Sequence, residues 1–191
     1  RGVGRNNAAG DLGNTLRQAR ESGMSPRQRV AAMIRRLTDI QAMGLKTAQG
    51  MVYAEGFYWD LNPETRAWSK RFFERHKRMP SMMQAGLYSA VHHYLLAIKA
   101  SGTDNAGSVM KQMKATPVND FFAKNGRIRE AGRMVHDILL VHVKPPAASN
   151  VPSASLNVLT VIPGDQASLP LPSNPPPHLT THPAPPPPPR P

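Results

Sequence analysis

Apolar side chains recur at helical spacing over the longest patterned stretch of the chain, residues 82–101. They follow one another at intervals of three and four residues, which places them on one face of a helix. Gly102 comes directly after the stretch and is suited to end it. The pattern therefore predicts a long helix over residues 82–101. The apolar positions of its face are Leu87, Ala90, Val91, Tyr94, Leu95 and Ile98.

A second patterned stretch, residues 51–78, changes from apolar and aromatic to strongly charged. Its first half predicts a strand over residues 48–59. Asn62 is suited to cap a helix, and Pro63 fits the first helical position. The second half therefore predicts a helix over residues 63–77. A strand that leads directly into a capped helix is typical of α/β domains.

The remaining pattern gives shorter elements. Gly44 is suited to stop a short helix that Thr38 or Asp39 would cap. From Pro163 the composition changes to Pro, Ser and His, which predicts polyproline II or disorder because the apolar content is too low to offset the entropy of ordering. Further predictions are helices over 10–23, 38–43 and 105–113, strands over 29–34, 135–143 and 155–162, and a hairpin-like segment over 126–132.

Length and charge bound the class of protein. The 191 residues suffice for one domain, or for one domain and a tail. Cysteine is absent, and no apolar run approaches the roughly 20 residues of a membrane span. The formal net charge of +12 permits binding to nucleic acid or to an anionic membrane. Basic helix faces without such a partner are the favoured explanation of the charge, because the arginines are not interleaved with stacking aromatic residues.

Several long stretches resemble one family of binding proteins. They are GFYWDLNPETRAWSKRFFERHKRMP, QAGLYSAVHHYLLAIKASGTDNA and TPVNDFFAKNGRIREAGRMVHDILLVHVK. They are similar to the C-terminal half of the substrate-binding proteins of ABC transporters, in the branched-chain amino-acid (leucine/isoleucine/valine) subgroup. The resemblance extends over roughly residues 6–170 in collinear order.

The resemblance implies an α/β chain with an incomplete type I periplasmic binding protein fold, in which two lobes enclose a ligand. By that resemblance, residues 1–52 are the end of the second lobe and residues 53–129 are a returning segment of the first. Residues 130–162 are the final crossing and terminal strands, and 163–191 are a proline-rich disordered tail. The opening halves of both lobes and a signal peptide would lie in a missing part of the protein, so we expect weak or no ligand binding by this chain alone.

The same resemblance indicates two ligand-binding loops, each after the end of a strand. The first contains Asn7, Ala8 and Asp11, where the amides of a helix N-terminus can hold a carboxylate. The second contains Thr38 and Asp39, where an acid can pair with a ligand ammonium. Asp11 and Asp39 also fit a purely structural role as helix caps, and the sequence leaves both alternatives open.

The implied function is that of a solute-binding component of an ABC importer for branched-chain or related amino acids or small carboxylates. Its partners would be the small ligand and the membrane permease subunits, and its location the periplasm. We predict no enzyme activity, no cofactor, no metal and no nucleic acid, because no catalytic or metal-ligand spacing is present; His92 and His93, for example, point about 100° apart on a helix. The alternative that the net charge suggests is a basic nucleic-acid-associated protein.

Overall fold

The computed structural model describes residues 2–5, 14, 18, 21–23, 29–32, 36–149 and 154–170 of the chain. Five strands in this part form one sheet: β1 (Gly2–Arg5), β2 (Arg29–Ala32), β3 (Val52–Glu55), β6 (Ile138–Val143) and β7 (Leu156–Ile162). Their order is β1-β2-β3-β6-β7. The first three are parallel, whereas β6 is antiparallel to β3 and β7 is antiparallel to β6.

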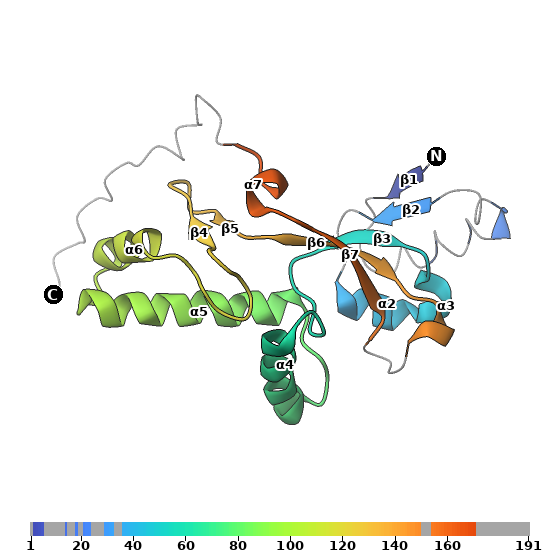
Figure 1. The fold of residues 1–191 in the computed structure, drawn as a ribbon, viewed down its shortest axis with the longest axis horizontal. Helices are drawn as coiled ribbons and strands as arrows, with labels where there is room; N and C mark the ends of the chain where they lie inside the picture. The colour runs from blue at the N-terminus through green and yellow to red at the C-terminus, as the bar shows by residue number, and fades with distance from the viewer. Residues whose placement is uncertain are drawn as a thin grey trace, which may run out of the picture.

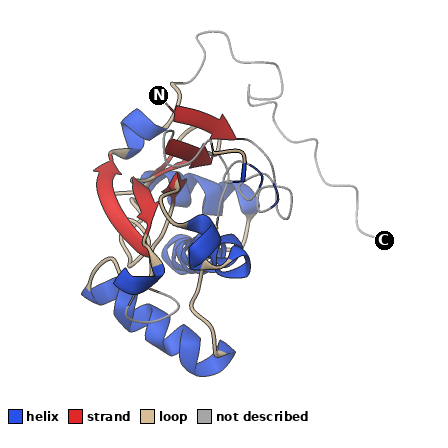
Figure 2. Ribbon diagram, turned by 90° about the vertical axis from the view of Figure 1, so that its right-hand side faces the viewer, coloured by secondary structure: helices blue, strands red, loops and turns tan. Residues whose placement is uncertain are grey.

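The helices are α2 (Leu37–Met43), α3 (Leu45–Ala48), α4 (Pro63–His76), α5 (Met82–Ser101), α6 (Ala106–Ala115) and α7 (Gly164–Ala167), with a short 3-10 turn at Pro146–Ala148. Figure 1 shows α4, α5 and α6 toward one end of the long β6–β7 ribbon and α2 and α3 toward the other end. β4 (Arg127–Ile128) and β5 (Met134–Val135) form a separate antiparallel pair. Figure 2 looks nearly along the axis of α5, with α4 crossing below it. The predicted α/β class is confirmed.

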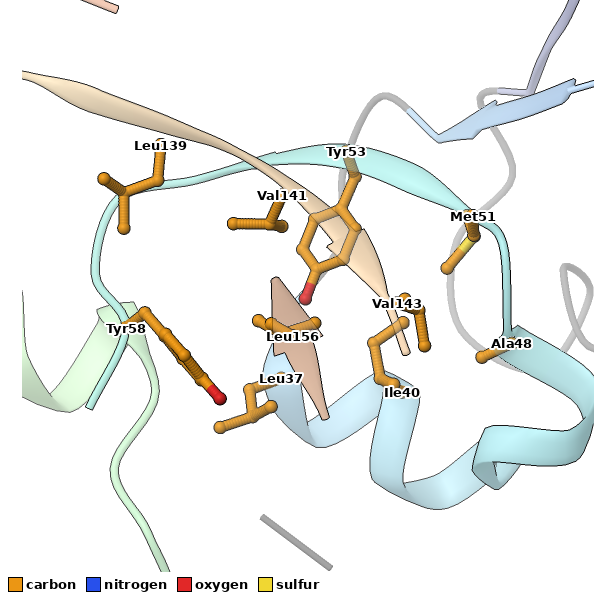
Figure 3. Packing of buried hydrophobic residues seen from close by; sticks show 10 residues of the cluster. All are labelled: Leu37, Ile40, Ala48, Met51, Tyr53, Tyr58, Leu139, Val141, Val143 and Leu156. Carbon is orange, nitrogen blue, oxygen red and sulfur yellow. The ribbon is translucent and has the colours of Figure 1, made fainter. Parts of the chain in front are cut away.

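The first of two hydrophobic clusters, here called the sheet core, lies between the sheet and helices α2 and α3 (Figure 3). Residues of β6 alternate in burial, so that Leu139, Val141 and Val143 face this core. Tyr53 of β3 is paired in register with Val141. The buried residues of the sheet core are Leu37, Ile40, Ala48, Met51, Tyr53, Tyr58, Leu139, Val141, Val143 and Leu156.

The second cluster, here called the aromatic core, lies where α4 and α5 begin. Phe57 meets the edge of Trp68 at a centroid distance of 5.9 Å, and Trp68 stacks on Phe121 at 4.3 Å. Phe57 belongs to this cluster, whereas its neighbour Tyr58 belongs to the sheet core. Trp59 packs against both clusters. The chain therefore crosses from one core to the other within residues 57–59.

The start of α4 confirms the predicted cap. The Asn62 side chain accepts a hydrogen bond from the Thr65 backbone N–H at 2.9 Å, and the Thr65 hydroxyl accepts one from the Asn62 N–H at 3.0 Å. Pro63 occupies the first helical position. Helix α4 ends at His76, and Lys77 takes the left-handed conformation with φ of 56°. The two hydrogen bonds between Asn62 and Thr65 fix the place where the chain turns into α4 after it has passed between the two cores.

Three predicted segments are shorter or interrupted. The strand predicted over 48–59 covers only Val52–Glu55, because Gly50 forms a turn with φ of 82° after α3 and the chain leaves the sheet at Gly56. The strand predicted over 135–143 is divided between β5 and β6, and Asp137 in the break accepts a hydrogen bond from the Gly164 N–H at 3.0 Å. That contact holds α7, which forms within the predicted tail.

The other helix predictions agree in type. α5 has the predicted ends, with Gly102 at its C-cap in the left-handed conformation. Asn105 caps α6, which extends to Ala115, two residues beyond the predicted end at 113. The predicted helix over 10–23 lies mostly outside the described residues. Within it, Asn14, Gln18 and Glu21 are helical, and Gly23 has φ of 73°.

Strand β7 borders the sheet on one side of β6 and contains a β-bulge. Leu140 of β6 pairs with Thr160, and the next residue, Val141, pairs with Val158. Leu159 is therefore the extra residue, and its side chain is exposed, as is that of Val161. A bulge of this kind bends the strand and increases its local twist.

Replacing Asn62 by Ala should lower the unfolding free energy by about 1 kcal/mol, because the orphan N–H of Thr65 loses its acceptor. Asn62→Gly should cost only a few tenths of a kcal/mol, since glycine leaves that amide open to water. Urea unfolding followed by circular dichroism measures both values. Equal stability of the Ala variant and the unmodified chain would contradict the role assigned to this cap.

Candidate functional site

The predicted second loop lies at the start of α2, which follows β2 in the chain. The helix begins at Leu37, and Arg36 is its N-cap, so Thr38 and Asp39 occupy the second and third helical positions. The prediction that Thr38 or Asp39 is the N-cap is therefore wrong by two to three residues. The reason is that Asp39 stabilises the start of the helix from its third position. Its carboxylate accepts a hydrogen bond from the backbone N–H of Arg36, three residues earlier, at 3.1 Å.

Asp39 is also close to the side chain of Arg36. Arg36 Nη2 lies 3.5 Å from Asp39 Oδ1, with the arginine side chain 48% and the aspartate side chain 19% exposed. An ion pair this long and this open to solvent contributes little stability. A carboxylate offers about four lone-pair positions, and Arg36 occupies two of them. With respect to the described residues, Asp39 therefore retains capacity to accept a further hydrogen bond.

The first predicted loop, with Asn7, Ala8 and Asp11, lies outside the described residues. The described part of the structure thus places Thr38 and Asp39 of the predicted site. Both follow the carboxyl end of a strand in the parallel part of the sheet, where open α/β sheets bind ligands.

Sequence analysis missed a buried acid next to this helix. Glu55, the last residue of β3, is 1% exposed and lies on the same face of the strand as Tyr53. Within the described part of the chain, neither carboxylate oxygen of Glu55 has a hydrogen-bond partner, and the hydroxyls of Tyr53 and Tyr58 also lack one. The sequence did contain a signal: Glu55 lies two positions after the apolar residue Tyr53, and the alternation of a strand puts both on the same, buried face.

Burial controls the protonation of this group. It raises the pKa of Glu55 to about 8, with a smaller upward contribution from Asp39, while the nearby backbone N–H groups of Gly56 and Leu37 lower the pKa in part. Burial likewise raises the pKa of Tyr58 to about 12 and raises that of Tyr53 further, the latter with help from Glu55. These three groups therefore bring no net charge into the sheet core near neutral pH.

Cavities also lie elsewhere in the described part of the chain. One of about 120 Å³ is at the crossing between the cores and is lined in part by Gly56, Phe57 and Leu139. One of about 540 Å³ lies beside α5 and α6, and one of about 400 Å³ lies between α4 and α5. The cavity at the crossing is far smaller than the 300–1,000 Å³ typical of small-molecule sites.

The described residues were compared with the requirements of a metal site and of a membrane-spanning helix. No three or more His, Asp or Glu side chains among them are arranged to hold a metal ion. None of the helices built from them combines the length and apolar character that a membrane crossing requires. Thr38 and Asp39 are both partly exposed at the start of α2, which follows the parallel strand β2.

Comparison with known proteins finds one family model that matches, the periplasmic binding protein model, over residues 2–150. A solved periplasmic binding protein from Burkholderia mallei is 40% identical, with a TM-score of 0.78 over 85% of this chain and 43% of that chain. A branched-chain amino acid ABC transporter periplasmic ligand-binding protein from Burkholderia xenovorans LB400 is 35% identical, with a TM-score of 0.84 over 88% of this chain and 46% of that chain. No curated protein matches.

A leucine binding protein from Thermotoga maritima shares the fold with a TM-score of 0.68 at 19% identity, over 86% of this chain and 45% of that chain. The chain thus spans less than half of the solved proteins that it matches. The predicted incomplete type I periplasmic binding protein fold is confirmed.

Glu55 should make stability fall as the pH rises. Because its pKa is about 8 in the folded chain and 4.5 ordinarily, the folded state keeps a proton that the unfolded state releases between those values. We expect the unfolding free energy, relative to that of Glu55→Gln, to decrease by on the order of a few kcal/mol from pH 5 to pH 8. Denaturant unfolding at several pH values measures this difference.

The matched control is Glu74→Gln, which alters an exposed glutamate of α4. Its unfolding free energy should follow that of the unmodified chain across the same pH range. If the unfolding free energies of the unmodified chain and of Glu55→Gln change with pH in parallel, Glu55 does not hold the proton that distinguishes the folded from the unfolded state.

Proposed function

Because the chain belongs to the periplasmic binding protein family, we propose that it is the carboxyl-terminal part of a solute-binding component of an ABC importer. The ligand would be a branched-chain or related amino acid, or a small carboxylate. Two lobes would close around it and present a closed shape to permease subunits in the membrane. The 35% identity to a ligand-binding protein of a branched-chain amino acid ABC transporter supports the ligand class, and the family supports a location in the periplasm.

The crossing between the two cores is the observation that carries this proposal. Neighbouring residues Phe57 and Tyr58 pack in different clusters, and β6 and β7 return to the sheet core after α4, α5 and α6. A chain that passes between two packed units more than once is suited to hinge closure. We propose that residues 1–52 belong to the second lobe, 53–129 to the first, 130–162 to the return and 163–191 to the tail, with the first boundary moved past β3 to the crossing at residues 57–59.

We further propose that the ligand contacts come from the two loops on the second lobe. Asp39 would pair with a ligand ammonium, because its carboxylate is partly exposed and keeps unused lone pairs. Thr38 would add a hydroxyl at the same helix start. Asn7, Ala8 and Asp11 would supply the opposing contacts to a carboxylate.

This chain alone should bind such a ligand weakly or not at all. Enclosing a zwitterion takes donors from both lobes, and the chain spans less than half of the solved relatives. Isothermal titration of the isolated chain with leucine, valine and aromatic amino acids should give no saturable heat. Saturable binding to the isolated chain would show that it encloses a ligand without the remainder of the fold.

In a protein completed by the unmatched part of the Burkholderia xenovorans relative, Asp39→Asn should weaken binding of an amino acid by about 10- to 100-fold, the range expected for loss of a charged hydrogen bond. Asn keeps an oxygen acceptor for the Arg36 N–H, so the start of α2 should stay intact. Circular dichroism checks the fold, and titration measures the affinity.

A small carboxylate without an amino group is the control ligand. Its affinity should be unchanged or higher in the Asp39→Asn variant, because the variant removes a negative charge near the site. Equal weakening of both ligands would assign Asp39 to the structure of α2 and not to ammonium binding.

A further inference from the structure

Helix α4 differs in charge between its two halves. In the first half, Glu64 pairs with Lys124 at 2.7 Å, and Arg66 pairs with Asp60 at 2.9 Å. The second half and the two residues that follow it are basic and contain a single acid, Glu74. The lysines and arginines of this part, here called the basic end, are Lys70, Arg71, Arg75, Lys77 and Arg78.

The five side chains of the basic end are exposed and unpaired. Within the described ranges, none of them takes part in an ion pair. Figures 1 and 2 show α4 projecting from the body of the described chain. Because burying an unpaired cation is costly, this surface stays in contact with water when the remainder of the two-lobe fold is present.

Helix stability does not explain these charges. A cation in the last turn of a helix interacts favourably with the helix dipole, which accounts for Arg75. Lys70 and Arg71 lie before that turn. Arg71 and Arg75 are also four residues apart, so two like charges share one side of the helix and destabilise it. The arrangement opposes the stability of α4, which indicates that the charges serve another purpose.

A lysine also occupies a position that favours glycine. Lys77 is the C-cap of α4 and has φ of 56°. This left-handed conformation is unfavourable for a residue with a Cβ atom, and α5 reaches it with Gly102. The chain thus keeps a positive charge where the backbone favours the smallest residue.

One large apolar side chain is exposed among these cations. Phe73 is 42% exposed. Lys70 precedes it by three residues on the helix, and the Lys77 backbone N–H donates to the Phe73 carbonyl oxygen at 2.8 Å. An aromatic ring with lysines and arginines around it is typical of helices at the surface of an anionic bilayer, where the ring enters the headgroup boundary and the cations contact the headgroups.

We propose that the basic end of α4, together with Phe73, docks on the anionic phospholipid headgroups of a membrane surface. The partner class rests on the proposed function, because a component of an ABC importer works beside a membrane. Each lysine or arginine near an anionic leaflet contributes roughly a fivefold factor in affinity, so five of them give a contact that is reversible but collectively strong. Such docking would hold the protein near the permease without using its ligand-binding loops.

Nucleic acid is a poorer partner for this surface. Proteins that bind single strands stack successive bases on several aromatic side chains. The basic end is accompanied by Phe73 as its one exposed phenyl ring, since the neighbouring Phe72 is half-buried and stacks on His76 at a centroid distance of 4.3 Å. The test below compares a membrane surface with other polyanions.

The experiment measures co-sedimentation of the full chain with lipid vesicles. The chain should bind phosphatidylcholine vesicles that contain about 30% phosphatidylglycerol and should not bind phosphatidylcholine alone. Affinity for the anionic vesicles should fall by at least about tenfold when the salt concentration is raised from about 0.1 M to about 0.5 M, because salt screens exposed charges.

The double variant Arg71→Gln and Arg75→Gln should weaken vesicle binding by roughly 25-fold, which is the loss of two of these contributions. Glutamine has a helix propensity close to that of arginine, so α4 should keep its structure. The matched control is Lys99→Gln with Lys111→Gln, which removes the same net charge from exposed positions of α5 and α6. Its affinity should change by less than about threefold, and circular dichroism checks the fold of both double variants.

A second measurement leaves the arginines unchanged. The chain has no cysteine, so Phe73→Cys and Lys111→Cys each introduce a single thiol for a polarity-sensitive dye. Anionic vesicles should increase the emission of the dye at position 73 and leave the emission at position 111 unchanged, because the proposal places position 73 alone in the headgroup boundary.

Three results would overturn the proposal. The first is the absence of binding to anionic vesicles, and the second is binding that the two arginine substitutions leave unchanged. The third is tighter binding to a DNA duplex or to polyglutamate than to anionic vesicles at the same salt concentration, which would assign the basic end to nucleic acid or to an acidic protein. Titration of the completed protein with amino acids measures the solute-binding function independently, so the failure of either proposal can be distinguished from the failure of the other.

Discussion

Two hydrophobic clusters have to be filled by consecutive residues of one short segment, and the architecture of the chain depends on that constraint. Phe57 is fixed among aromatic side chains at the start of α4 and α5, whereas Tyr58 points into the sheet core with Tyr53 and Leu156 (Figure 3). Trp59 touches both clusters. A shift of this segment by one residue would put Gly56 in the place of Phe57, or Asp60 in the place of Trp59, so an aromatic side chain would be lost from the packing in either direction.

Helix ends that are set by a nearby capping residue were predictable from the sequence. The start of α4 follows from Asn62 and Pro63, and the end of α5 follows from Gly102, because each residue acts on backbone groups within a few positions of itself. The start of α2 was not predictable in the same way. Its N-cap is an arginine, a residue without cap preference, and Asp39 supplies the contact from inside the helix.

The features that could not be predicted from the sequence depend on contacts between segments that are distant in the chain. Spacing shows that α5 has an apolar face, but it cannot show that Ala85 and Ser89 are the residues that pack against this chain. Likewise, alternation places Glu55 on the inner face of β3, but the extent of its burial follows only from the arrangement of α2 and the sheet. Of the predicted ligand contacts, the structure describes Thr38 and Asp39, and their role toward a ligand remains a prediction.

The bulge at Leu159 affects the tendency of copies of this chain to associate through strand β7 at high concentration. An edge strand presents unpaired backbone groups on which another strand can be added, and exposed apolar residues such as Leu159 and Val161 favour that addition. The extra residue shifts the alternation of donors and acceptors halfway along β7, so an incoming straight strand matches three residues on one side of it and then falls out of phase. The same irregularity that bends the ribbon thus limits fibril-like growth from the β7 edge of the described sheet.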